Sequence, residues 1–162
     1  MTQIDPSIAT DGLLVAAFLL GGAAYGVDAR EVQEVVKPGD ITRVHHAPPE
    51  VVGIRNLRGR IVTVLDLRLC LGLGNVVPSP DNRALIVDSH GETIGLLVDA
   101  VEDTFTTTME ALAPPPPNLP GPQSRSVRGV CRGGARLVSL LDLSVLLEQG
   151  HNTEPARDQI AR

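Results

Sequence analysis

The chain repeats itself, and this repeat constrains the fold more than any other feature of the sequence. Residues 53–67 align with residues 129–143 at an offset of 76, with six identical and four conservatively replaced positions. Residues 18–34 align with residues 87–103 at an offset of 69. A unit that occurs twice predicts two related halves. We place them at about 13–76 and 83–149 in one domain, with polar ends at 1–12 and 150–162.

The seven residues that separate the two offsets enter the second half in a proline-rich stretch. That stretch carries Pro114 to Pro117, Pro120 and Pro122. Loops on the protein surface tolerate insertions better than strands do, and clustered prolines are typical of loops. We therefore expect a long loop in the second half where the first half has a shorter one.

Each half reads as short strands separated by glycine turns. Leu14 to Leu20 and Ala84 to Val87 are predicted first strands, followed by turns at 21–22 and 89–91. Ile61 to Leu65 and Leu137 to Leu141 are uninterrupted apolar runs, which indicate strands buried on both faces. Leu65 and Leu141 are expected to be buried equivalents. Many short strands with few helices predict an all-β barrel or sandwich.

Two aspartates follow these apolar runs. Asp66 and Asp142 each precede an apolar stretch, Leu67 to Leu71 or Leu143 to Leu147, and then a glycine, Gly72 or Gly150. Aspartate before a helix and glycine after it are typical N-cap and stop signals. We interpret both aspartates as caps. A small enzyme with a pocket built on Asp66, Asp142 or Glu34 is the alternative, and it requires two carboxylates with raised pKa in one cleft.

Composition excludes several functions. The net charge is −5, and Phe18, Tyr25 and Phe105 are the only aromatic residues, so a nucleic-acid-binding barrel is disfavoured. Cys70 and Cys131 lie in apolar segments and are expected to be free buried thiols. His45 and His46 are neighbours on an extended segment, where they point to opposite faces. We therefore predict no metal and no cofactor.

The two halves differ most at one hairpin tip. Asn56-Leu57-Arg58-Gly59 in the first half aligns with Arg132-Gly133-Gly134-Ala135 in the second. A turn needs only the glycine, and asparagine also has a turn role because it tolerates a positive φ. Arg58 has no such role, and a guanidinium beside an exposed Leu57 suits an interface with a carboxylate-bearing partner.

The segment that contains this tip carries a family resemblance. Val51 to Arg68, with Gly53, Asn56-Leu57-Arg58-Gly59 and Asp66-Leu67-Arg68, resembles the signature of CheW-like chemotaxis coupling proteins. The likeness extends over nearly 140 residues. It also covers Tyr25 to Asp28, Ile41 to Val44, Ala47-Pro48, Gly95 to Asp103 and the loop at Pro114 to Pro117.

The resemblance implies a fold and a set of contacts. The fold is two five-stranded OB/SH3-like barrels, intertwined by strand exchange, with short helices. A groove between the barrels is implied to bind the cytoplasmic tip of chemoreceptors, through Val32, Glu34, Asn56, Leu57, Arg58, Gly95, Val98, Val101 and Thr104. The regulatory domain of a CheA-type histidine kinase is the second implied partner, with contacts at Pro116, Asn118 and Leu119.

Four residues depart from the family pattern. They are His45-His46, Thr104 in place of an aliphatic residue, and Asn118 where an aromatic residue is common. The expected function is a non-catalytic adaptor, cytoplasmic and recruited to membrane-associated receptor arrays, with no insertion into the membrane and no nucleic acid. A chemotaxis-like pathway that controls pili or another output is the alternative within this class.

Overall fold

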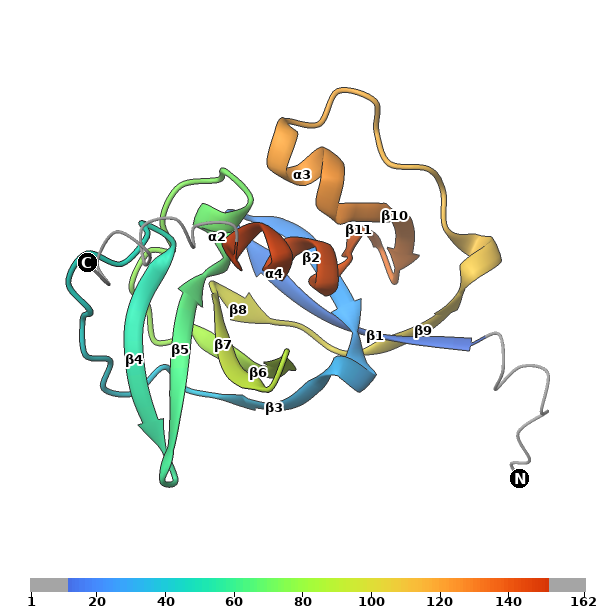
Figure 1. The fold of residues 1–162 in the computed structure, drawn as a ribbon. Coiled ribbons are helices and arrows are strands. Elements are labelled where there is room, and N and C mark those ends of the chain that lie inside the picture. The colour runs from blue at the N-terminus through green and yellow to red at the C-terminus, as the bar shows by residue number, and fades with distance from the viewer. Residues whose placement is uncertain (1–11, 152–162) are drawn as a thin grey trace, which may run out of the picture.

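The computed structural model describes residues 12–151, which form two mixed β-sheets with a few short helices (Figure 1). Residues 1–11 and 152–162, which hold most of the two predicted polar ends, lie outside the described residues. The first sheet has the order β10 (Val127–Gly133), β11 (Arg136–Leu141), β2 (Ala23–Asp28), β1 (Gly12–Leu20) and β8 (Ala100–Val101), and β9 (Phe105–Thr108) also pairs with β1. The second has the order β3 (Val32–Val36), β6 (Arg83–Ser89), β7 (Glu92–Val98), β5 (Arg60–Asp66) and β4 (Val51–Leu57).

The two halves of the chain exchange strands. Strands β1 and β2 come from the first half but pair with β8, β9 and β11 of the second half. Strands β6 and β7 come from the second half but pair with β3 and β5 of the first half. The predicted intertwining of the two repeats is therefore confirmed.

The repeat alignment also holds at the level of register. Thr63 pairs with Ile94 in the parallel β5–β7 ladder, and their repeat equivalents Ser139 and Tyr25 pair in the β11–β2 ladder. A register slip of one residue would turn every side chain to the opposite face of the sheet. The conserved register therefore explains why the same positions carry the same residue types in both halves.

One isolated bridge in each half joins the loop after the third strand to the fourth strand. Thr42 bridges to Ile54, and Ala113 bridges to Val130. In each half, a single bridge and not a continuous ladder thus joins this loop to the fourth strand. The offset between the halves is 71 at Thr42 and Ala113 and 76 at Ile54 and Val130, so most of the inserted residues lie between the bridge and the strand, as expected.

A single apolar cluster draws on both halves and forms the main core. Leu65 and Leu141 are buried in it, with 8% and 1% of their surface exposed, which confirms that they are buried equivalents. The expectation that both apolar runs are buried on both faces is wrong. Ile61 and Leu137 are 61% and 62% exposed, because these strands alternate between an inner and an outer face near the hairpin tips.

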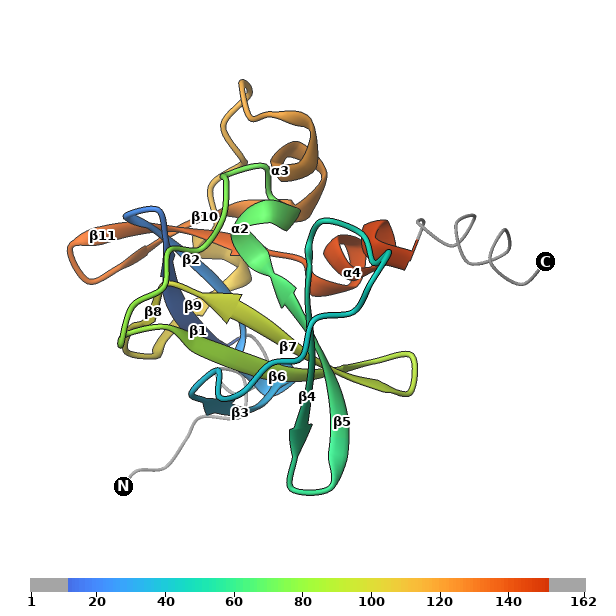
Figure 2. The same ribbon diagram turned by 90° about the vertical axis from the view of Figure 1, so that its left-hand side faces the viewer.

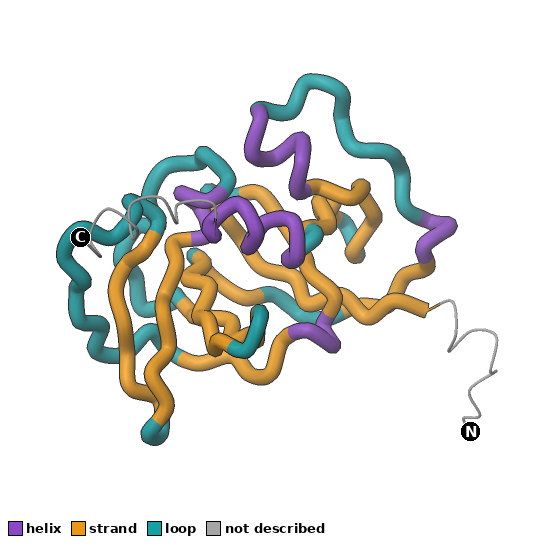
Figure 3. Tube along the Cα trace, in the orientation of Figure 1, coloured by secondary structure: helices purple, strands orange, loops and turns teal. Residues whose placement is uncertain are grey.

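The helices are η1 (Ala29–Glu31), α2 (Leu67–Cys70), η2 (Met109–Ala111), α3 (Gly121–Ser126) and α4 (Leu143–His151), and Figure 3 shows that α2, α3 and α4 lie on one side of the sheets. Asp66 caps α2 by accepting a hydrogen bond from Leu69 N at 3.1 Å. Asp142 accepts from Ser144 N at 3.0 Å at the start of α4. The prediction that Gly150 ends this helix is wrong, because α4 continues to His151.

Both cysteines are free, as expected, with Cys131 buried and Cys70 partly buried. Among the described residues, no helix is long and apolar enough to cross a membrane. The β4–β5 and β10–β11 hairpins project from the body of the molecule in different directions, which separates their tips (Figure 2).

Candidate partner-binding surface

The tip of the β4–β5 hairpin is a two-residue turn. Arg58 has a φ of 51° and Gly59 a φ of 88°, so both residues adopt the left-handed conformation that tight hairpin turns require. The side-chain oxygen of Asn56 accepts a hydrogen bond from Gly59 N at 2.8 Å. The side chain of Asn56 is exposed, and its hydrogen bond stabilises the turn. The side chain of Arg58 makes its hydrogen bond outside the turn, with Glu34.

Arg58 forms an ion pair across the second sheet. Its Nη2 donates to Oε2 of Glu34, a residue of β3. Because β3 and β4 are the two outermost strands of this sheet, the pair connects its opposite edges. The two side chains remain 66% and 34% exposed. Exposed ion pairs typically contribute about 0–1 kcal/mol to stability, so the pair orients two charges at the surface more than it holds the fold.

Two further positions of the predicted groove are related by the repeat. Val32 pairs with Val87 in the β3–β6 ladder, and Val101 pairs with Phe18 in the β8–β1 ladder. Val32 packs partly against the main core, whereas Val101 and the neighbouring Thr104 are exposed. Val32 and Val101 thus occupy equivalent places on the edge strands of the two sheets.

Three residues of the predicted groove are buried and offer no side chain to a partner. Leu57 is 6% exposed and Val98 is 0% exposed, so the expectation of an exposed Leu57 is wrong. Leu57 is the last residue of β4, and the alternation of the strand turns it inward against Val62 and Val64 while Asn56 faces out. Gly95 is also buried, and a Cβ there would lie 3.4 Å from Val62 Cγ1.

The second half builds its tip differently. Gly133 has no room for a side chain, because a Cβ would lie 2.6 Å from the Phe105 ring. Gly134 supplies the positive φ of 65° at the position equivalent to Arg58. The ring of Phe105, which comes from β9, therefore lies where Leu57 packs in the first half, and no charged side chain stands at the turn.

The segment predicted to bind the kinase lies in the long second-half loop. Pro116 and Asn118 are exposed, and Leu119 packs partly against the main core. The following helix α3 is fixed by Gln123, which accepts a hydrogen bond from Tyr25 Oη and donates one to Leu71 O, both at 3.4 Å. The loop is thus anchored at its C-terminal side and presents Pro116 and Asn118 outward.

One surface feature was missed from the sequence. Ile61 and Leu137, equivalent in the repeat, each expose an aliphatic side chain beside an arginine, Arg60 or Arg136. Arg60 lies 3.8 Å from Asp88, and Arg136 lies 3.7 Å from Glu102. The sequence held one signal for the exposure of Ile61 and Leu137, namely the arginine that precedes each of them in the repeat. The uninterrupted apolar runs that begin at Ile61 and Leu137 nevertheless favoured their burial.

Two side chains that could serve as a nucleophile or a general acid, Cys70 and Asp142, have pKa values shifted in the direction that disfavours such a role. Burial raises the pKa of the Cys70 thiol to about 12, which disfavours the reactive thiolate. Partial burial raises the pKa of Asp142, but hydrogen bonds from Ser144 and Val145 outweigh it, so that the pKa is lowered. The rings of His45 and His46 lie 6.5 Å apart. Within residues 12–151, no group of three or more His, Cys, Asp or Glu side chains gathers into a metal site.

Comparison with known proteins places these features in a family. The model of the CheW-like domain family matches residues 15–151. The chain is 30% identical to the chemotaxis protein CheW of Klebsiella aerogenes, over 80% of this chain and 78% of that protein. It is 27% identical to the protein FrzA of Myxococcus xanthus, over 86% and 88%. The crystal structure of the scaffolding protein TtCheW from Thermoanaerobacter tengcongensis matches with a TM-score of 0.74 and 33% identity, covering 83% of this chain and 86% of that one.

Proposed function

The chain belongs to the CheW-like domain family, and we propose that it is a non-catalytic adaptor that couples chemoreceptors to a CheA-type histidine kinase. The observation that carries this proposal is the exposed Glu34–Arg58 pair at the β4–β5 tip. The repeat gives the second half no counterpart of it, so folding does not require it. An exposed guanidinium of fixed position is a suitable anchor for a partner carboxylate.

In this proposal, receptors bind at the edge strands of the two sheets. The contact is made by the residues of the predicted groove that remain accessible. Leu57, Gly95 and Val98 support this surface from within the core. The accessible residues are Val32, Glu34, Asn56, Arg58, Val101 and Thr104.

The kinase contact is proposed at the outward-facing part of the long second-half loop. Pro116 and Asn118 are exposed there, and Leu119 anchors the segment to the core. Proline fixes φ and lowers the entropy that a loop loses on binding, which favours such a segment as a recognition element. The adaptor would act in the cytoplasm, at receptor arrays. The relative FrzA, which is not named as a chemotaxis protein, supports extending the proposal to chemotaxis-like pathways with other outputs.

The test is calorimetric titration of the protein with the regulatory domain of the kinase from the same genome, and with a soluble receptor-tip fragment. We expect saturable binding to each and no turnover of the chain's own. Asn118→Ala and Arg58→Gly should weaken binding of the kinase and the receptor, respectively. Failure of both partners to bind would overturn the proposal, while exchanged effects of the two variants would reassign the two surfaces.

A further inference from the structure

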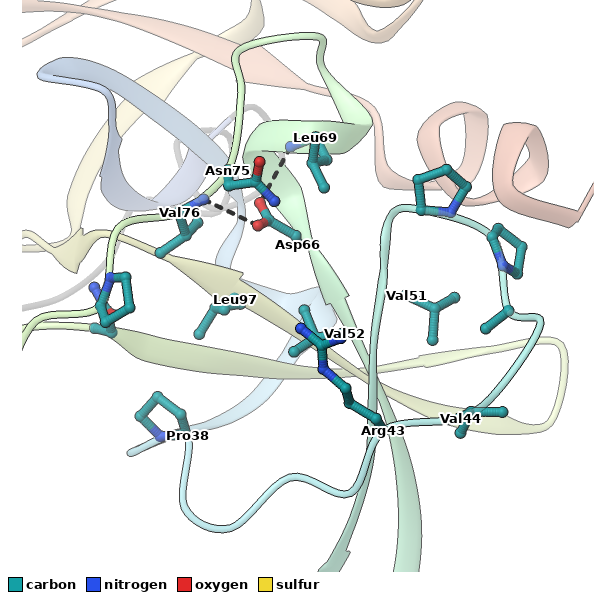
Figure 4. Close-up of a pocket in the computed structure, with 15 residues that line it drawn as sticks. Pro38, Arg43, Val44, Val51, Val52, Asp66, Leu69, Asn75, Val76 and Leu97 are labelled. Carbon is teal, nitrogen blue, oxygen red and sulfur yellow. Dashed lines mark hydrogen bonds between the residues drawn. The ribbon is translucent and has the colours of Figure 1, made fainter.

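A second surface feature lies apart from the partner-binding surface. A hollow of about 510 Å³ opens between residues 38–52 and residues 75–82, over the ends of β5 and β7 (Figure 4). Its walls are largely aliphatic, with several valines and four prolines, and also carry the polar residues Arg43 and Asn75. Such walls lose little conformational entropy when they bind. The prolines are Pro38, Pro48, Pro49 and Pro78.

The floor of the hollow combines apolar side chains with the polar groups of Asp66 and Asn82, which already have hydrogen-bond partners. Val76 and Leu97 are buried there. The carboxylate of Asp66 accepts hydrogen bonds from Leu69 N at 3.1 Å and Val76 N at 2.9 Å. Asn82 accepts from Ser79 N at 3.0 Å. A ligand therefore needs an apolar group at the floor and no polar partner for these side chains.

The wall carries one free charge. Arg43 is exposed, and its side chain extends over the hollow toward Val52 (Figure 4). It makes no hydrogen bond and no ion pair with any residue in the part of the chain that the structure describes. A guanidinium at the edge of an apolar hollow favours a ligand that combines an aliphatic group with a carboxylate.

The repeat offers an internal control for this hollow. In the second half, the loop between the bridge and the fourth strand is longer and contains α3, which contacts α4. The second half also places Arg128 at the position of Val52. The first half thus lacks both the helix and the bulky side chain that the second half has near this place, and it keeps an open apolar surface instead.

We propose that this hollow binds an extended segment of a partner protein, in which an aliphatic side chain adjoins an aspartate or glutamate. The aliphatic side chain packs on Val76 and Leu97, and the carboxylate pairs with Arg43 at the rim. The site goes beyond the proposed coupling function and is separate from Arg58 and Glu34. Its test needs neither receptor nor kinase, so the two proposals can fail independently.

The experiment measures fluorescence anisotropy of two labelled pentapeptides with the sequences Pro-Leu-Glu-Leu-Pro and Pro-Leu-Gln-Leu-Pro, both capped at their ends. We expect the glutamate peptide to bind about tenfold more tightly, as a charge-assisted hydrogen bond predicts. Arg43→Gln should remove this difference. Val52→Arg, which copies the second half, should abolish binding of both peptides. The matched control is Arg132→Gln, an exposed arginine outside the hollow, which should change nothing.

Several results would overturn the proposal. Equal affinities of the two peptides, no binding at millimolar concentration, or binding unaffected by Arg43→Gln would each contradict it. Free glutarate competing as strongly as the peptide would show a site for small carboxylates instead of a peptide site. Arg43 and Val52 lie in or beside loops, and the melting temperature of each variant checks that it is folded.

Discussion

The two hairpin tips of the repeat differ far more than the strands that carry them. Both hairpins have the same register and the same bulge beside a glycine, Gly53 or Gly129. At the tips, however, the first half places Arg58 in a left-handed turn and pairs it with Glu34, whereas the second half has Gly134 at that position and an exposed Arg132 at the position of Asn56. The shared features build the fold. The fold does not require the features in which the tips differ, so these features are the candidates for a role in function.

This comparison predicts that shared core positions dominate stability. Leu65→Ala and Leu141→Ala should each reduce the free energy of unfolding by about 2–5 kcal/mol, because each removes packed methyl groups and leaves a cavity. The effect should be larger at Leu141, which is less exposed. Chemical denaturation measures both. If neither variant changes the unfolding midpoint, the two positions are not equivalent core sites.

The next largest effect is expected at the shared bulge glycines. A Cβ at Gly53 would lie 2.3 Å from Thr42 O, and one at Gly129 would lie 2.7 Å from Ala113 O. Gly53→Ala and Gly129→Ala should therefore push apart the single bridge in each half and cost about 1–3 kcal/mol, as overpacking does. Gly121→Ala is the control, because its nearest neighbour is 4.0 Å away. An unchanged thermal melt for Gly53→Ala would mean that the bridge is dispensable.

The repeat made much of this fold predictable from sequence. The succession of strands and turns along each half, the buried pair Leu65 and Leu141, and the capping aspartates follow from spacing and residue type. The exposure of Ile61 and the burial of Leu57 did not follow, because burial does not alternate strictly along these strands: Arg60 and Ile61 are both exposed. An apolar residue near a hairpin tip faces either the core or the solvent, and only the tertiary packing decides which.

The partner-binding surface was predictable to a smaller extent. Arg58 was singled out from the sequence because the second half has Gly134 in its place, whereas Glu34 has an acidic equivalent in Asp103, and the structure pairs Arg58 with Glu34. Phe105, which takes the place of Leu57 beside Gly133, could not be assigned from sequence. It comes from a strand that contacts the tip only through tertiary structure.

The capping aspartates should contribute less than the bulge glycines. Asp66→Ala and Asp142→Ala should each lower the free energy of unfolding by about 0.5–2 kcal/mol, because each leaves helix N–H groups without an acceptor. The effect should be greater at Asp66, which is buried and also accepts from Val76 N at 2.9 Å. Urea denaturation of the two variants measures the difference, and equal effects would show that the additional bond to Val76 contributes nothing.

A smaller effect is expected from the charge of Asp142 alone. Hydrogen bonds from Ser144 and Val145 outweigh partial burial and lower the pKa of its carboxyl in the folded state. A lowered folded pKa gives stability that is present above the unfolded value of about 4 and is lost as the pH falls through the folded value. Asp142→Asn should therefore be less stable than the wild type at pH 7, and the two should converge as the pH falls through the lowered pKa of the folded state. A constant gap between them across this range would contradict the assignment.

We propose that the first tip carries function while the shared scaffold carries the fold, and the variant Arg58→Gly separates these two roles. Glycine is the residue at the equivalent position, and it accepts the φ of 51° without steric cost. Glycine removes the steric cost of the positive φ at this turn, and this gain offsets the loss of the Arg58–Glu34 ion pair. The free energy of unfolding should therefore change by less than about 1 kcal/mol.

The measurement is the affinity of Arg58→Gly for the receptor-tip fragment, determined by calorimetry beside its melting temperature, with Gly134→Arg as the reciprocal control. We expect near-normal melting and at least a tenfold loss of receptor affinity for Arg58→Gly, and unchanged affinity for Gly134→Arg. Normal receptor affinity of Arg58→Gly would contradict it, and so would a collapse of its melting temperature.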